Sequence, residues 1–420
     1  MKFQRISASM PTHIKILSFT IETQALRAVL LSFLTTRILV FLIIFLSSST
    51  IPMRTGPFTY ASPNNLLLDG LVRYDSWWYH AIVTQGYDIG NIETGVQGNV
   101  AFFPLYPLFV KMMAAITGNV FLGGVLVSNI AFLIALAYLY ALTRREFDDE
   151  TAARAVFYLA AAPTAVFFSA MYTESLYIAL VVATFYYAHR GQWDRAALCG
   201  ALTAATRNTG ILMAAVIALE GMHQHGARFR PPSLTFAGWP AYYRQQLKLA
   251  MNSWRCIIAG SLVLTGLLFY MAYLSNAFGD PLGFIHVQST WGREVSAGSA
   301  FKILGNTIRE LNIGPNIWLG QFNPVILMDT LSTLVFIPLI IAVVLKMRPA
   351  HAVFVGLTFV VPLSTGTVGS MNRYILMLIP CFMLLAHWAK RSWLDRLVLG
   401  VSLPLMAYSS VLFSHWYFAG

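Results

Sequence analysis

The stretch from Leu30 to Ser48 reads LLSFLTTRILVFLIIFLSS, and Arg37 is its one charged residue. A bilayer has a hydrocarbon core of about 30 Å, which a helix of about 20 apolar residues crosses. Similar apolar runs recur towards the C-terminus; hydrophobic residues make up 57% of 420 positions and charged residues only 11%. A soluble domain cannot bury so many apolar helices. The sequence therefore predicts an all-α polytopic membrane protein.

The net charge of +11 could by itself indicate a nucleic-acid partner. No basic stretch, however, is interleaved with stacking aromatic residues in a soluble domain. In a membrane protein, excess Lys and Arg is typical of cytoplasmic loops and of contact with anionic lipids. We therefore expect membrane lipids, and no nucleic acid, among the partners.

The first apolar stretch follows a basic leader, which contains Lys2, Arg5, Lys15 and Arg27. A cleaved signal peptide is one interpretation. The charge of Arg37 and the many later apolar segments favour an uncleaved first helix. Because basic flanks stay in the cytoplasm, this helix should run outward. Residues from about 50 to 119 then form a large first outer loop.

Near the end of this loop, residues 102–111 read FFPLYPLFVK, which is apolar but short and contains two prolines. We predict an interfacial helix here. With that assignment, 19 of the 28 Lys and Arg residues fall in cytoplasmic segments and seven in outer segments, while Arg37 and Arg207 lie within apolar runs. A full span here would invert every later segment. The positive-inside rule therefore favours the interfacial helix.

The remaining apolar segments complete a bundle of roughly ten to eleven transmembrane helices. They lie at about 120–142, 153–170, 173–188, 196–219, 256–274, 325–345, 352–364, 374–389 and 397–417. The segment 196–219 is interrupted by Arg207-Asn208-Thr209-Gly210, which predicts two half-helices that enter and return, with the break surrounded by protein or a cavity. We divide the chain into a catalytic membrane module, residues 1–276, and a C-terminal membrane module, residues 277–420, whose outer loop spans 277–324.

The densest polar cluster lies in the first outer loop, where residues 73–80 read RYDSWWYH. Interfacial aromatic residues alone are common at membrane surfaces. A carboxylate among them can act as a general base towards a hydroxyl group, and aromatic faces suit sugar rings. We predict Asp75 as the catalytic residue, and the substrate-binding candidates of this cluster are Arg73, Trp77, Trp78 and His80.

Glu174 lies at the outer tip of the hairpin 153–188, either as a solvated turn residue or at the rim of an outward cavity. Arg207 lies in an apolar segment, where an arginine costs about 2.5–3.5 kcal/mol on insertion scales. It either pairs with an acid in the membrane or, with Asn208 and the backbone amides at the start of the second half-helix, binds a phosphate.

Two later outer segments add further substrate-binding candidates. Residues 280–294 read DPLGFIHVQSTWGRE, and the candidates there are His286, Gln288, Trp291 and Arg293. Arg373 opens the next-to-last span. It is either an interfacial anchor or a second phosphate ligand, because the planar fork of arginine suits oxyanions.

Together these residues fit a transferase that takes a sugar from a lipid phosphate. Nucleotide sugars are cytosolic, and the chain contains no Asp-x-Asp pair, no Walker motif and no Gly-x-Gly-x-x-Gly. Departing phosphate is stabilised by cations, and transfer passes through an oxocarbenium-like state. A transporter or flippase of lipid-linked sugars is the alternative, although such proteins often show matched broken helices in both halves. We expect no cofactor and no metal-ligating residues.

The chain also resembles the GPI mannosyltransferase II (PIG-V) family and its prokaryotic relatives, which are GT-C type membrane transferases. The motifs that carry the resemblance are Arg73-Tyr74-Asp75, residues 103–107 (FPLYP), residues 163–169 (PTAVFFS), Arg207-Asn208-Thr209-Gly210 and Arg373-Tyr374. The resemblance implies a GT-C-like bundle with a catalytic aspartate at Asp75.

The same resemblance implies a polyprenyl- or dolichyl-phosphate mannose donor, inversion at the anomeric carbon, and a lipid or glycan acceptor. Tyr74 departs from the tryptophan that is usual in eukaryotic members, and the loops are short, as in prokaryotic relatives. A prokaryotic member would lie in the plasma membrane with its active site facing outward. A eukaryotic one would lie in the endoplasmic reticulum membrane with a lumenal site.

Overall fold

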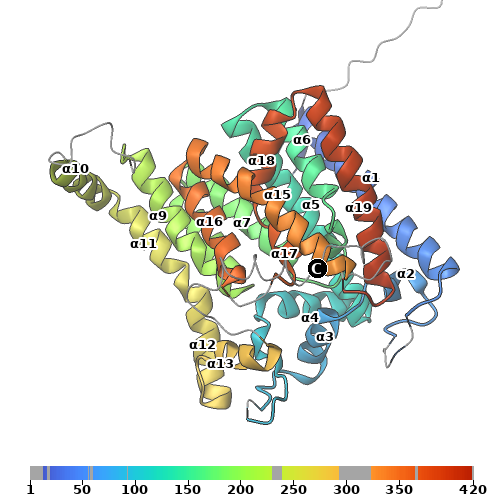
Figure 1. The fold of residues 1–420 in the computed structure, drawn as a ribbon. Helices are drawn as coiled ribbons and strands as arrows, with labels where there is room; N and C mark the ends of the chain where they lie inside the picture. The colour runs from blue at the N-terminus through green and yellow to red at the C-terminus, as the bar shows by residue number, and fades with distance from the viewer. Residues whose placement is uncertain are drawn as a thin grey trace, which may run out of the picture.

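The structure is a computed structural model. It describes residues 13–16, 19–54, 56, 60–91, 93–228, 239–292, 323–364 and 368–418. Two four-residue strands, β1 (His13–Ile16) and β2 (Phe19–Glu22), pair as an antiparallel hairpin directly before the first helix. The rest of the described chain folds into helices joined by turns and short irregular segments (Figure 1). The all-α prediction is confirmed apart from this hairpin.

Five helical segments of the described chain are long and apolar enough to cross a membrane. They are α1 (Thr23–Thr50), α5 (Val120–Glu146), the continuous pair α11 (Trp254–Leu262) and α12 (Leu264–Phe278), α15 (Pro324–Lys346) and α19 (Ser392–Ser414). Their outer faces carry exposed apolar side chains such as Ile38 and Phe269. Large apolar surfaces of this kind suit lipid. The chain is an integral membrane protein, and the total of ten to eleven spans stays a prediction.

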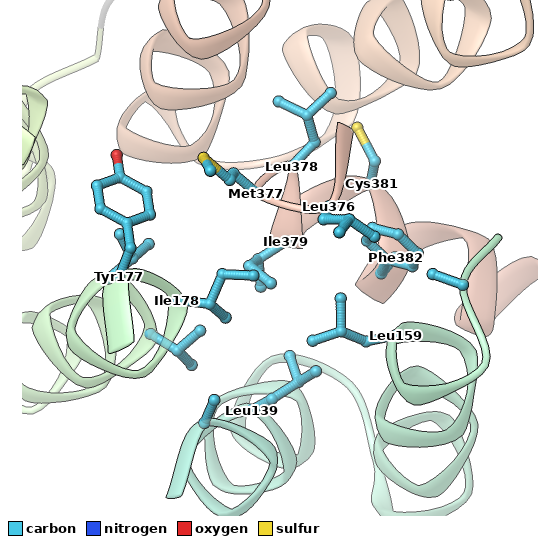
Figure 2. Packing of buried hydrophobic residues seen from close by; sticks show 14 of the residues in the cluster. Leu139, Leu159, Tyr177, Ile178, Leu376, Met377, Leu378, Ile379, Cys381 and Phe382 are labelled. Atoms are coloured by element: carbon cyan, nitrogen blue, oxygen red, sulfur yellow. The ribbon is translucent and has the colours of Figure 1, made fainter. Parts of the chain in front are cut away.

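The centre of the bundle lies around α5. This helix packs against α4 (Leu105–Thr117), α6 (Asp149–Ala160) and α7 (Glu174–His189), and α18 (Ile379–Trp388) packs against α6. Figure 2 shows Leu139 of α5, Leu159 of α6 and Ile178 of α7 near Ile379 and Phe382 of α18. All five side chains are buried, so apolar packing joins the C-terminal helices to the N-terminal half.

The predicted span 153–170 differs from the structure. Helix α6 ends at Ala160, and the chain continues through the short 3₁₀ helix η2 (Ala165–Phe168) to the start of α7. Pro163 cannot donate a helical hydrogen bond, so a regular helix does not continue through it. Arg37 donates hydrogen bonds to carbonyl groups of this irregular segment. Its guanidinium donates to the oxygens of Ala160 and Ala165, each at 2.8 Å, and to Ser169 Oγ at 3.0 Å.

The predicted break in the segment 196–219 is confirmed. Helix α8 (Trp193–Ala204) ends before Arg207, η3 (Asn208–Ile211) forms the break, and α9 (Leu212–Gln224) continues after it. Gly210 makes the break possible, because a Cβ there would lie 2.3 Å from the Thr203 carbonyl group. The two half-helices pack together and against α11.

Helix α4 has 13 residues and is about 20 Å long, shorter than the bilayer core, which agrees with a helix that does not span. In Figure 1 it lies with α3 (Asp75–Gln85), α12 and α13 (Gly283–His286) below the rest of the bundle. Further short helices are α2 (Leu66–Gly70), η1 (Asn99–Ala101), α10 (Trp239–Asn252) and η5 (Val287–Trp291).

The segment 352–389 also contains more breaks than predicted. Helix α16 (Pro349–Leu363) is followed by α17 (Met371–Ile375), and a bend at residues 376–378 separates α17 from α18. The predicted single span 374–389 is therefore two short helices. The division of the chain at residue 276 stays a prediction.

Candidate active site

A cavity of about 740 Å³ opens between α3, α13–η5, the turn before α7, the break between α8 and α9, and α17. Residues from segments far apart in the sequence thus meet at one site. The predicted site residues that line it are Asp75, Glu174, Arg207, Asn208, His286, Gln288, Trp291 and Arg373. Arg293 lies outside the described residues.

Asp75 is the first residue of α3, and a strained residue presents it. Tyr74 has φ 49° and ψ −109°, a conformation that non-glycine residues rarely adopt. Its ring is held between Trp416 and Phe418 at centroid distances of 5.4 and 5.0 Å. The Asp75 N–H donates to the Tyr172 hydroxyl oxygen at 3.2 Å. Strain that the surroundings maintain is typical of functional sites.

Two carboxylates and two arginines alternate across the cavity. Arg373 donates to Asp75 Oδ2 through NH1 at 2.7 Å, and its Nε lies 3.3 Å from Glu174 Oε1. Arg207 donates to the same Glu174 oxygen through NH1 at 2.8 Å. Glu174 is 1% exposed and Asp75 22% exposed at the side chain. Equal numbers of opposite charges reduce the cost of burying this group.

Arg207 therefore has the acidic partner that its membrane position suggested, and it also faces the cavity. Among the described residues, its hydrogen bonds use only NH1, to Glu174 and weakly to Thr173. Its guanidinium lies over the Tyr374 ring at 5.6 Å. The remaining guanidinium N–H groups can bind an anion, so pairing with an acid and binding a phosphate are compatible roles.

Tyr79, which the sequence analysis did not select, adds a hydroxyl to the same wall. Burial raises the pKa of Tyr79, so the hydroxyl stays neutral, and it donates to Thr173 Oγ1 at 3.4 Å. Tyr79 lies one helical turn after Asp75 in the RYDSWWYH cluster, and this spacing could have marked it as a site residue.

The position of Arg373 depends on an acid in α15. Asp329 is 1% exposed, and its carboxylate accepts the N–H groups of Ser370 at 3.2 Å and Asn372 at 2.8 Å. Ser370 has φ 70°, a left-handed conformation, and the Thr164 hydroxyl donates to the Asn372 carbonyl at 3.0 Å. These bonds fix the start of α17. The sequence carried a signal for Asp329, a single acid in the apolar run 325–345.

The segment α13–η5 forms an aromatic wall of the cavity. Phe284 packs against Phe103 with ring centroids 5.3 Å apart, and Trp291 packs against Trp78 at 5.0 Å. His286, half exposed, contacts Asp280 Oδ2 through Nδ1 at 2.7 Å. The FPLYP motif, which includes Phe103, supports this wall. Its Leu105 N–H donates to the Ala205 carbonyl at the end of α8.

The other predicted residues of the first outer loop lie behind the cavity wall. Arg73 is fully buried, pairs with Asp69 at 2.6 Å, and donates to the Ser414 carbonyl at 3.0 Å, so it anchors the end of α19. Trp77 and His80 pack on Phe121, and burial lowers the pKa of His80. Trp78 does not line the cavity itself but packs on Trp291 and Phe102, which do.

Two carboxylates paired with arginines, beside an aromatic wall and in one cavity among the helices, make this the candidate active site. The model of the family Mannosyltransferase (PIG-V) matches residues 14–276 of this chain. The chain belongs to this family. No curated protein matches the sequence.

Solved structures of membrane proteins are similar to this chain at low identity. ArnT from Cupriavidus metallidurans, bound to undecaprenyl phosphate, is 14% identical, with a TM-score of 0.48, over 91% of this chain and 76% of that one. The oligosaccharyltransferase from Archaeoglobus fulgidus is 14% identical, with a TM-score of 0.43, over 93% of this chain. The chain spans 53% of the length of that oligosaccharyltransferase.

Proposed function

We propose that the protein transfers mannose from a polyprenyl- or dolichyl-phosphate donor to a hydroxyl group of a lipid or glycan acceptor, with inversion. One observation carries this proposal: Arg373 joins Asp75 to Glu174, and Arg207 joins the same Glu174, within one cavity. A candidate base and two cations that suit a phosphate thereby lie at one site.

In the proposed reaction, the acceptor hydroxyl oxygen attacks the anomeric carbon while the bond from that carbon to the phosphate oxygen breaks. The polyprenyl phosphate leaves with the bonding electron pair, and Arg207 and Arg373 stabilise its charge. Asp75 accepts the hydroxyl proton. Arg373 binds Oδ2 of Asp75, so Oδ1 is the oxygen that takes this proton. The aromatic wall supports the sugar, and the mechanism uses no cofactor.

The membrane setting supports a donor attached to lipid. Apolar side chains exposed on the long helices place the chain in the bilayer, where a polyprenyl tail dissolves. The excess of basic residues in the other loops supports an outward-facing cavity, and nucleotide sugars are confined to the cytosol. In a prokaryotic cell the site would lie on the outer side of the plasma membrane.

The experiment uses the purified chain in nanodiscs with radiolabelled polyprenyl-phosphate mannose, and GDP-mannose in a parallel arm. We expect mannose to leave the lipid donor when a hydroxyl acceptor lipid is added, and no turnover with GDP-mannose. Turnover of GDP-mannose would disprove the lipid-phosphate donor. Movement of the labelled lipid between leaflets of sealed vesicles without transfer would favour the alternative of a flippase.

A further inference from the structure

Three side chains meet at the end of α7 opposite Glu174. They are His189 at the last turn of α7, Glu146 at the end of α5, and His351 near the start of α16. Glu146 Oε1 lies 3.1 Å from His189 Nδ1 and 3.2 Å from His351 Nε2. Since α7 rises about 1.5 Å per residue, this cluster lies about 22 Å along the helix from the cavity.

The three side chains are buried, and five of their six polar atoms have no hydrogen-bond partner among the described residues. Both histidine side chains are fully buried and Glu146 is 8% exposed. Glu146 Oε1, both ring nitrogens of His189 and both of His351 lack a properly aligned hydrogen bond. Buried polar atoms nearly always have a partner, so atoms that converge without bonding one another indicate a ligand between them.

The spacing suits a small divalent cation. Zinc binds histidine nitrogen at about 2.0–2.1 Å and carboxylate oxygen at about 2.0–2.2 Å, so two ligand atoms of a tetrahedral site lie about 3.3 Å apart. The distances of 3.1 and 3.2 Å match this edge length. The ligand atoms of all three residues lie within 4.8 Å of one another.

A second carboxylate stands behind one of the histidines. Glu220 in α9 places Oε2 3.4 Å from Nε2 of His189, the ring nitrogen that faces away from Glu146. Arg348 and Gln224 hold the other Glu220 oxygen, at 2.6 and 2.9 Å. Histidines that bind metal typically present their other nitrogen to a carboxylate in this way, and Glu220 would fix the tautomer of His189.

We propose that Glu146, His189 and His351 bind one divalent transition-metal ion, with zinc the expected ion, and that Glu220 orients His189. The ion joins α5, α7 and α16 at the end of the bundle remote from the cavity. This departs from the expectation that the chain has no metal ligands. The ligands come from three separated helices, so no short spacing marked them in the sequence.

The test measures metal in tag-free, full-length protein in nanodiscs after equilibration with micromolar zinc and dialysis. We expect about one zinc per chain by mass spectrometry. After exchange for Co²⁺, we expect visible absorption of a tetrahedral ion. Glu220→Gln should weaken zinc about 10- to 100-fold, as losses of such supporting carboxylates do. Glu146→Gln and His351→Gln should weaken it further.

His387→Gln is the matched control, since His387 is a half-buried histidine that packs on Phe147 beside Glu146 but is not part of the cluster. It should keep the parental zinc content. A chelator should lower the unfolding temperature of the parent and of His387→Gln, but not that of Glu146→Gln. Parent protein that holds no zinc at micromolar concentration would overturn the proposal even if every variant misfolds. A zinc content in Glu146→Gln and His351→Gln equal to that of the parent protein would overturn the proposal as well.

Discussion

Asp75 binds Arg373 through one carboxylate oxygen, and in the proposed reaction the other oxygen takes the proton of the acceptor. We predict that Asp75→Asn lowers turnover at least about 10²-fold, the lower end of what a general base contributes. The amide keeps a hydrogen bond to Arg373 but cannot accept the proton. The measurement is sugar transfer and donor affinity side by side, and donor affinity should change little.

Asp88→Asn is the control for this variant, because Asp88 lies exposed in the same loop. Its turnover should equal that of the parent. Turnover near the parental rate in Asp75→Asn would remove Asp75 from the mechanism and make Glu174 the next carboxylate to test. A lower unfolding temperature together with lower donor affinity would instead assign Asp75 a structural role.

Arg207 is the better arginine for a binding test, because Glu174 keeps Arg373 as a partner when Arg207 is removed. We predict that Arg207→Ala weakens the binding of polyprenyl phosphate about 10- to 100-fold, equal to about 1.5–3 kcal/mol for one lost charge-assisted contact. Titration of polyprenyl phosphate into nanodiscs measures this. Arg190→Ala, at the far end of α7, should bind like the parent, and unchanged affinity in Arg207→Ala would place the phosphate elsewhere.

At the scale of elements, the site depends on short irregular segments between helices. Arg37 in α1 supports the segment before α7, and Asp329 in α15 supports the start of α17. Each supplies hydrogen bonds that a regular helix would make internally. Helices that are distant in the sequence therefore position the residues of the cavity.

We predict that Asp329→Asn lowers kcat more than it raises KM for the donor, because Asp329 acts only through the position of Arg373. One amide oxygen can replace only part of the bonds to the N–H groups of Ser370 and Asn372. Steady-state kinetics measure the changes in kcat and KM separately, and Asp329→Glu should recover part of the activity. Equal unfolding temperature and unchanged kinetics in Asp329→Asn would show that α17 keeps its position without this acid.

At the scale of the whole molecule, the proposed sidedness can be tested with single cysteines at exposed positions. Thr94 lies between α3 and α4, in the predicted first outer loop, and His225 lies directly after α9. In a background without the native cysteines, Thr94→Cys should react with an impermeant maleimide added to whole cells, and His225→Cys should react only after lysis. This follows from the excess of basic residues on the side of His225. The reverse pattern would place the cavity in the cytoplasm.

The membrane class, the break at residues 207–210 and the acidic and arginine side chains that line the cavity could be predicted from the sequence alone. Apolar length and the cost of an arginine in the membrane are properties of local sequence, so they can be read without a fold. The split of the segment 153–170 was missed, because apolar composition alone does not show that Pro163 and the donors of Arg37 stabilise an irregular segment there.

The different positions of Arg73 and Arg373 depend on the tertiary structure. Arg73 and Arg373 both lie beside polar and aromatic residues in the sequence, yet Arg73 is buried against Asp69 and the end of α19, while Arg373 reaches Asp75 in the cavity. The structure likewise brought Glu146, His189 and His351 together from three helices. The contacts of Arg373 with Asp75, of Arg73 with the end of α19 and among these three residues depend on the packing of segments far apart in the chain. Helical periodicity carries no information about which helix ends meet.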